Sequence, residues 1–184
     1  TITVQADGAI LIGGDFTTVN GSGRNGIARL NRDGSLDRTF DPGAGATGGA
    51  VLALAPLAEG KVLVGGSFTS LGNGAAYLAR LNADGSSDSS FPLGGGPNGP
   101  VRALAAQEDG RLVIGGEFSA FGAAIRTGIV RLNPDGSLDT SFDPGAGPSD
   151  VVSAVGVQAD GKVIVGGAFT NFNGAALNRL ARLN

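Results

Sequence analysis

Oxygen-bearing side chains occur at every second position in two short segments of this chain. The pattern is Asn-x-Asp-x-Ser-x-Asp, and its members are Asn31, Asp33, Ser35 and Asp37 in one segment and Asn133, Asp135, Ser137 and Asp139 in the other. Oxygen ligands at this spacing can hold calcium. The glycine of each segment is at the wrong place for an EF-hand loop, and no Glu closes the ring. The sequence therefore favours a hairpin turn in which the aspartate accepts backbone N–H bonds, with calcium as the alternative.

The sequence contains little else that could carry out catalysis. Cys, His, Met and Trp are all absent, which excludes disulfides, thiol nucleophiles, histidine bases and the usual zinc and copper ligands. No nucleophile elbow and no phosphate-binding Gly-Lys-Ser/Thr motif occurs. The carboxylates unique to one copy of the repeat described below, Glu108 and Glu117, stand alone in sequence, whereas glycosidases use a converging pair. We therefore expect no enzymatic activity and no cofactor.

These residues belong to a sequence that is repeated four times. Arg-Leu-Asn begins at residues 29, 80, 131 and 182, a step of 51 residues each time. A Gly-Gly-x-Phe element accompanies it and ends at Phe16, Phe68, Phe118 and Phe169. A period of this size marks a repeat architecture, in which each unit buries its apolar faces against its neighbours. Residues common to all copies are expected to be structural: the phenylalanines in the core, and each arginine paired with a nearby Asp rather than part of an anion-binding ring.

The third copy shows how one repeat is expected to fold. Alternating apolar and polar residues predict a strand over 101–107, and a continuous aliphatic run predicts a fully buried strand over 111–118. The Asp-Gly pair between them is typical of a tight hairpin, and the Gly pair near the end of the second run allows a bulge. Two further strands are expected over 128–133 and 138–142, the last one more polar. No long helical period occurs, so the chain is predicted to be all-β.

Four antiparallel strands in about 51 residues are typical of a β-propeller blade. A β-solenoid has much shorter coils, and a string of separate sandwiches would leave units too small to hold their own cores. We expect one domain over 1–184. Its four repeats are expected at approximately 1–47, 48–98, 99–148 and 149–184, and the first and the last of them are incomplete. Three arrangements remain open: an arc cut from a longer propeller, a compact ring with one defective blade, and two arcs that close a larger ring.

The strongest copy of the motif runs from Gln158 to Phe169 and reads Gln-x-Asp-Gly-Lys-Val-Ile-Val-Gly-Gly-x-Phe. With Ala-Arg-Leu-Asn and Asp-Gly-Ser-Leu-Asp-x-Ser-Phe-Asp-Pro-Gly, it resembles the delta-sixty repeat family across essentially the whole chain. The resemblance implies propeller-like repeats in a secreted or surface protein of bacteria, and no catalytic residues. Kelch blades are a weaker resemblance, because kelch expects a Tyr and a Trp, and here Trp is absent and Tyr77 is the only Tyr.

Charge and composition limit the partners. The net charge of −3 and the pI near 4.8 argue against nucleic acid, and no apolar run is long enough to insert into a membrane. Thr1–Val4 lacks the features of a signal peptide, and a chain that opens in mid-strand is expected to be a piece of something longer. The loops that follow each Gly-Gly-x-Phe element are the candidate place for recognition, with Arg24, Asn25, Tyr77, Arg126 and Asn178 as their large polar or aromatic residues. Simple sequence drift on a solvent-exposed rim is the favoured explanation of the same variation.

These features favour a non-enzymatic structural, adhesive or protein-interaction scaffold at the bacterial surface, with protein partners or neighbouring repeats. Two alternatives remain open. One is a lectin-like propeller that binds glycans, although lectins usually stack sugars on aromatic side chains. The other is a self-assembling subunit, a homo-oligomer in which copies complete a larger propeller.

Overall fold

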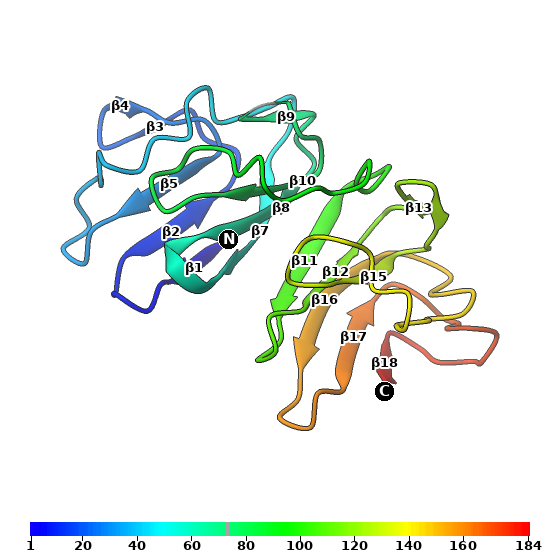
Figure 1. Ribbon diagram of the computed structural model, residues 1–184. Coiled ribbons are helices and arrows are strands. Elements are labelled where there is room, and N and C mark those ends of the chain that lie inside the picture. The colour runs from blue at the N-terminus through cyan, green and yellow to red at the C-terminus, as the bar shows by residue number, and fades with distance from the viewer. Residues whose placement is uncertain (73) are drawn as a thin grey trace. The chain divides into compact units, whose positions relative to one another are not determined.

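The computed structural model describes residues 1–72 and 74–184 and shows an all-β chain in these ranges (Figure 1). The only helical element there is a short 3₁₀ turn at Ala58–Gly60. Among the described residues no helix is long and apolar enough to cross a membrane. The predicted fold class is confirmed.

Each repeat contributes one three-stranded antiparallel sheet, in which the aliphatic run forms the middle strand. The strands of the four sheets, in chain order, are β1 (Ile2–Val4), β2 (Ile10–Gly13) and β5 (Ile27–Leu30); β7 (Val51–Pro56), β8 (Val62–Gly66) and β10 (Leu78–Leu81); β11 (Val101–Ala106), β12 (Leu112–Gly116) and β15 (Ile129–Leu132); and β16 (Val152–Val157), β17 (Val163–Gly167) and β18 (Leu180–Leu183). The middle strands are rich in β-branched and aliphatic residues, and β8 and β12 are buried along their whole length because both of their faces are covered.

The predicted bulge is present in the second, third and fourth sheets. The first strand shifts register between Val51 and Ala53, between Val101 and Ala103, and between Val152 and Ala154. In each case the shift lies opposite the Gly pair of the middle strand. The absence of side chains on that pair leaves room for the first strand to bend.

The loops after the Gly-Gly-x-Phe elements carry short hairpins and bridges. The first repeat has β3 (Thr18–Val19) paired with β4 (Ser22–Gly23), and the third has β13 (Ala120–Phe121) paired with β14 (Ala124–Ile125). In the second repeat, β9 (Ser70–Leu71) pairs with β6 (Ala46–Thr47), which belongs to the segment before the sheet. The first and third of these loops are thus folded on themselves, whereas the second is paired with the segment before its sheet.

The expected fourth strand is reduced to a single bridge. Leu132 pairs with Leu138, and the other copies have Leu30 with Leu36 and Leu81 with Ser87. One residue later an aspartate carboxylate accepts the backbone N–H two residues ahead, as Asp139 does from Ser141 at 2.9 Å. This turn bends the chain away before a second pair of residues can join the ladder.

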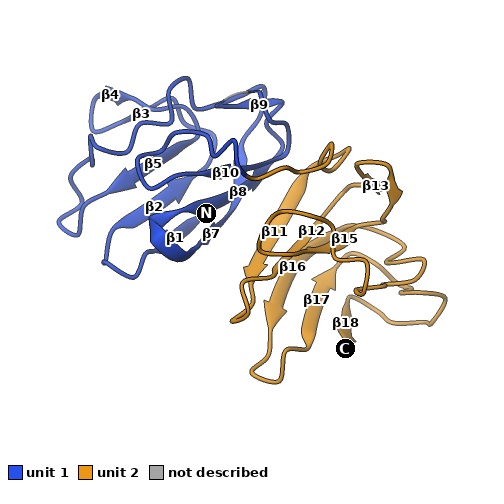
Figure 2. Ribbon diagram, viewed as in Figure 1, with its two compact units in different colours: residues 1–90 blue, residues 91–184 orange. Residues whose placement is uncertain are grey.

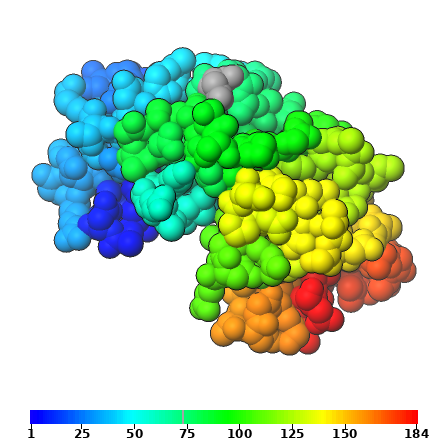
Figure 3. All heavy atoms as spheres, viewed as in Figure 1, coloured from blue at the N-terminus to red at the C-terminus, as the bar shows by residue number. Residues whose placement is uncertain are grey.

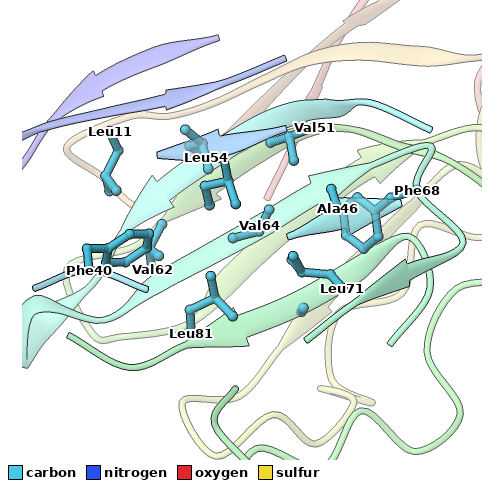
Figure 4. Packing of buried hydrophobic residues seen from close by; sticks show 12 residues of the cluster. Leu11, Phe40, Ala46, Val51, Leu54, Val62, Val64, Phe68, Leu71 and Leu81 are labelled. Atoms are coloured by element: carbon cyan, nitrogen blue, oxygen red, sulfur yellow. The ribbon is translucent and has the colours of Figure 1, made fainter. Parts of the chain in front are cut away.

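The described chain divides into two compact units, Thr1–Ser90 and Phe91–Asn184 (Figure 2). Each unit holds a core that combines residues of two successive repeats. In the first unit, Leu11 and Phe40 pack with Leu54, Val64 and other side chains of the second repeat (Figure 4). In the second unit the shared core consists of Val113, Ile129, Phe142, Val152, Val163, Val165, Phe169, Phe172 and Ala181. The predicted core role of the repeated phenylalanines is confirmed for those in these clusters. The boundaries drawn for the four repeats stay a prediction.

Candidate interaction surface

The Asn-x-Asp-x-Ser-x-Asp motif forms a hairpin turn that uses its own oxygen atoms. Oδ1 of Asp33 accepts the backbone N–H of Ser35 at 2.9 Å and its hydroxyl at 2.6 Å, while Nδ2 of Asn31 donates to Oγ of Ser35 at 2.9 Å. The second segment repeats these contacts through Asn133, Asp135 and Ser137. The hydroxyl hydrogen bond, followed by the backbone one, lowers the pKa of both Asp33 and Asp135.

The remaining aspartate of each motif pairs with the repeated arginine. Nε of Arg29 lies 2.7 Å from Oδ2 of Asp37, and Nε of Arg131 lies 2.7 Å from Oδ2 of Asp139. Within 1–72 and 74–184, no group of three or more Asp or Glu side chains is placed to hold a metal ion. The turn and the ion pair account for the geometry of the motif, and calcium binding stays a prediction.

The predicted pairing of a repeated arginine with an aspartate is confirmed for Arg29, Arg80 and Arg131, and for Arg182 it stays a prediction. The second repeat has the same pair, with Arg80 and Lys61 both 2.8 Å from Oδ2 of Asp88. Burial alone would raise the pKa of Asp139, but hydrogen bonds from Ser141 and Arg131 and the charge of Arg131 outweigh it and hold the pKa at about 2. These arginines are therefore part of the framework.

Three of the loop residues singled out from the sequence make hydrogen bonds to the backbone, and those of Arg24 and Arg126 stay within their own loops. Nη1 of Arg24 donates to the carbonyl of Gly23 at 2.8 Å, and Nη1 of Arg126 donates to that of Ile125 at 2.9 Å. Nδ2 of Asn25 donates to the carbonyl of Ala44 at 2.8 Å. Arg24, Asn25 and Tyr77 belong to the first unit, and Arg126 and Asn178 belong to the second. The Thr69–Tyr77 loop includes Asn73, which lies outside the described residues.

Tyr77 occupies an unusual backbone position. Its φ is 63°, and Arg179 at the same point of the fourth repeat has a φ of 65°. The first and third repeats carry Gly26 and Gly128 there. At all four positions the N–H donates to the carbonyl of the preceding phenylalanine, as Tyr77 does to Phe68 at 3.0 Å. The framework thus imposes a left-handed conformation that favours glycine, which gives Tyr77 a structural constraint that its sequence position alone did not indicate.

A polar pocket of about 300 Å³ lies in the second unit, beside the loop from Ser119 to Thr127. It presents the carboxylates of Glu117 and Asp150 and the hydroxyls of Ser119, Thr127 and Ser149. Glu117 also forms an ion pair with Arg102. Glu117, which follows the last residue of β12, thus lines a pocket. Glu108 lies in the turn before the first residue of β12, at the opposite end of the strand. The five residues of β12 span roughly 16 Å, too far for the two glutamates to converge.

Hydrogen bonds fix the walls of this polar pocket. Oγ of Ser149 accepts the N–H groups of Thr170 and Asn171 at 3.2 and 3.1 Å. Oδ1 of Asn98 accepts those of Ser119 and Ala120 at 2.9 and 3.0 Å. Asn98, Ser149 and Asp150 were missed because they lie in Gly- and Pro-rich segments between repeats. The fold places both segments beside the loop from Ser119 to Thr127, from which they are separated in the sequence.

An apolar pocket of about 410 Å³ borders the same loop. Its walls include Phe121, Ala123 and Ala124 of the loop, together with Leu93 and Leu138. The loop from Ser119 to Thr127 therefore contributes to the polar pocket and to the apolar pocket. These two pockets together are the candidate interaction surface of the second unit.

Comparison with known proteins agrees with this architecture. Two crystal structures of the extracellular domain of BT4673 from B. thetaiotaomicron, named a one component system in the first and a hybrid two component system in the second, are similar to the chain. Their TM-scores are 0.58 and 0.55 at 13% and 12% identity, with 100% and 99% of this chain covered. The chain spans about a fifth of those structures, 21% and 20%.

A search of curated proteins finds no match. A family model described as a domain of unknown function (DUF5122) beta-propeller matches the chain four times, at residues 5–40, 58–91, 107–142 and 158–184. The matched segments start near the first turn of each repeat and include the Gly-Gly-x-Phe and Arg-Leu-Asn elements. Since these segments make up more than half of the sequence, the chain belongs to the DUF5122 beta-propeller family.

Proposed function

We propose that this chain is a non-enzymatic protein-interaction scaffold of the delta-sixty type, from an extracellular or surface protein of bacteria. The observation that carries the proposal is that the repeated polar residues have structural roles, whereas the polar residues found in only one repeat line a pocket. Those that repeat, such as Arg131, Asp135 and Asp139, are engaged in turns and ion pairs of the framework. Two polar groups that do not repeat line a pocket on a loop: Asp150, and Glu117 together with its ion-pair partner Arg102 outside the pocket lining.

The chemistry of the two pockets indicates the kind of partner. Carboxylates and hydroxyls in the polar pocket suit a Lys or Arg side chain, and the net charge of −3 favours basic partners. The apolar pocket suits an aliphatic or aromatic side chain. A protein segment with a basic residue and an apolar residue near each other fits both.

A glycan fits this surface less well. Phe118 is the one aromatic residue that lines the polar pocket, and it is 3% exposed. Its ring is therefore covered, whereas sugar binding usually relies on an open aromatic face. The extracellular location is supported by the similarity to the BT4673 extracellular domains.

Selection from a phage-displayed peptide library on the purified chain tests the proposal. We expect the selected peptides to combine a Lys or Arg with a large apolar residue. Their binding should fall at least tenfold in Asp150→Asn and in a variant whose loop 119–127 is replaced by the equally long sequence of 170–178. The matched control is Glu108→Gln, which removes an exposed carboxylate from a turn outside the polar pocket and should leave binding unchanged.

A library that yields no peptide, or peptides whose binding ignores both variants, would overturn the proposal. A glycan array run on the same protein separates the alternative. Specific glycan binding that is lost in Asp150→Asn would identify a lectin instead.

A further inference from the structure

The β3–β4 hairpin of the first repeat is contacted by two guanidinium groups. Nη1 of Arg24 donates to the carbonyl of Gly23 at 2.8 Å, and Nη2 of Arg38 donates to Oγ of Ser22 at 3.4 Å. Ser22 and Gly23 are the two residues of β4, so both arginines reach the same strand. The blue segment that contains β3 and β4 lies beside the lighter blue segment that follows β5 (Figure 1, Figure 3).

Three polar groups gather on one side of this hairpin. Ser22 and Arg24 are two positions apart, and side chains two positions apart in an extended strand point to the same face. Arg38 reaches that face through the hydroxyl of Ser22. Nδ2 of Asn20 also donates to the carbonyl of Gly34 at 3.2 Å, which ties the hairpin to the turn that precedes Arg38. The three groups are therefore held together by the fold of the first repeat.

Most of the hydrogen-bond donors of these two guanidiniums are unused. A guanidinium has five N–H donors and no acceptor, and each of these two makes one hydrogen bond to the described residues. Nε of Arg24 is buried without a hydrogen-bond partner, which is unfavourable. Within 1–72 and 74–184 neither arginine forms an ion pair, in contrast to Arg29 with Asp37. Two positive charges on one hairpin thus lack a counter-charge.

The third repeat contains the same arginine on its own hairpin. Arg126 corresponds to Arg24, and its Nη1 likewise donates to the carbonyl of the preceding residue, Ile125, at 2.9 Å. Its Nε is also buried without a hydrogen-bond partner. One arginine in this position is therefore a feature of the loop in both units.

The other two groups of the first hairpin are missing from the third repeat. Ala124 stands in place of Ser22, and Thr140 stands in place of Arg38. The second guanidinium and the hydroxyl therefore distinguish the first hairpin from the third, and a function that needs all three groups can be tested against this natural comparison.

We propose that the β3–β4 hairpin binds a phosphate or sulfate group through Arg24, Arg38 and Ser22. Such a group has a charge of about −2 and three or more acceptor oxygens, which matches two guanidiniums and a hydroxyl. Arginine is suited to these anions because its planar fork donates two parallel hydrogen bonds. Since Nε of Arg24 is covered, its outer Nη groups make the contact. The anion is either free or a monoester on a larger molecule, because both present the same oxygens.

This inference goes beyond the proposed function, since it concerns an anion and the first unit, whereas the polar pocket of the second unit carries carboxylates. Either can fail without the other. The peptide selection depends on Asp150 and the loop from Ser119 to Thr127, and the titration below depends on neither.

An NMR titration of the isotope-labelled chain with sodium sulfate tests the proposal, with sodium chloride added to keep the ionic strength constant. We expect the amide signals of Ser22, Gly23 and Arg24 to shift and to saturate, and those of the β13–β14 hairpin to stay in place. Arg38→Thr, which introduces the residue of the third repeat, should raise the Kd at least about tenfold, because it removes one of the two guanidiniums.

The matched control is Arg32→Thr. It removes the same charge from another exposed arginine of the first unit, whose guanidinium donates to the carbonyl of Asp7. The Kd for sulfate should stay unchanged. An equal loss of affinity in Arg32→Thr and Arg38→Thr would mean general charge attraction and would overturn the proposal, as would the absence of any saturable shift at the β3–β4 hairpin.

Transfer of the missing groups to the third repeat provides a second test. Ala124→Ser combined with Thr140→Arg should create a saturable shift at the β13–β14 hairpin, which the unmodified chain lacks. If this variant binds no sulfate there, the assignment of the site to these three side chains is wrong.

Two further titrations identify the ligand. Inorganic phosphate and methyl phosphate separate the two sources of the anion: an ester that binds at least as tightly as the free anion indicates a group carried by a larger molecule, and an ester that binds more weakly indicates the free anion. Acetate should bind more weakly than sulfate, since it has one charge and two oxygens. Tighter binding of acetate would overturn the assignment to a phosphate or sulfate group.

Discussion

The guanidinium of Arg131 joins the Asp139 carboxylate to the ring of Phe142. Its Nε lies 2.7 Å from Oδ2 of Asp139, and its Cζ lies 4.7 Å from the centre of the ring. Asp139 in turn fixes the bend after the single bridge by accepting the hydroxyl of Ser141 at 2.6 Å. The Arg131–Asp139 ion pair thus links a strand, a turn and a core aromatic residue.

Replacement of this carboxylate is expected to destabilise the protein strongly. The side chain of Asp139 is only 7% exposed, and Asp139→Ala leaves a nearly buried guanidinium without its partner, a loss of about 3 kcal/mol. Asp135→Ala, in the exposed turn of the same hairpin, should destabilise the protein much less, because water can replace the hydrogen bonds of an exposed carboxylate. Urea unfolding followed by circular dichroism measures both. Equal losses would mean that the ion pair adds nothing to the turn.

Acid should weaken the fold in a defined range of pH. The pKa of Asp139 is about 2 in the folded state and about 3.9 in an unfolded chain, so its contribution is complete above about pH 5 and is lost progressively as the pH falls through the folded pKa, to about pH 1. Asp139 alone should account for roughly 2 kcal/mol of that loss. Urea unfolding across this range should show a shallower pH dependence for Asp139→Asn than for the unmodified chain. An unchanged slope would place the acid sensitivity elsewhere.

Replacement of Arg179 by glycine should stabilise the protein. Arg179 is exposed and has a φ of 65°, so Arg179→Gly removes a backbone penalty of about 1 kcal/mol while losing little packing. Arg179→Ala keeps a Cβ atom and should bring much less gain. Thermal and urea unfolding compare the three proteins. If alanine stabilises as much as glycine, the benefit comes from removal of the arginine and not from relief of the backbone.

Two equivalent glycines should respond differently to alanine. At Gly115 the new Cβ atom would lie 2.5 Å from Val152, which a packed core can accept only by shifting, at a loss of about 1–3 kcal/mol. At Gly166 the nearest atom is 3.7 Å away, so the folded monomer should tolerate alanine with almost no change. Urea unfolding followed by circular dichroism measures both variants. Similar losses at both sites would show that the glycines are required by the strand itself.

Calcium should not stabilise the hairpin turns. Oδ1 of Asp33 and Oδ1 of Asp135 already accept hydrogen bonds within the turn, so adding calcium, or removing it with a chelator, should leave the unfolding temperature unchanged. Isothermal titration calorimetry provides a direct check. A calcium-dependent rise that disappears in Asp135→Ala would restore the metal site that the spacing allows.

Much of the framework could be predicted because it repeats. Asp-Gly turns, the aliphatic run before Gly115 and the pairing of Arg131 with an aspartate each follow from local chemistry seen several times. The length of the fourth strand was harder to predict, because it depends on the turn formed by the carboxylate of Asp139 and not on the apolar pattern of the segment.

The candidate site was less predictable. Asp150 and Ser149 stand in a segment whose composition indicates only a break between strands, and they face Glu117 through long-range packing. The left-handed position of Tyr77 left a trace in the sequence, since two of the other copies have glycine there. That trace becomes informative only once the hydrogen bond to Phe68 shows why glycine is preferred.

The sharing of one core by two repeats has a consequence for how the chain can fold and grow. Leu11, Ile27 and Phe40 are buried by side chains of the second repeat, so a single repeat excised from the chain would expose its own interior and should not fold. The smallest element that can bury this core is therefore a pair of blades. Gain or loss of repeats by gene duplication and deletion would be tolerated only where each repeat keeps a neighbour with which it shares a core.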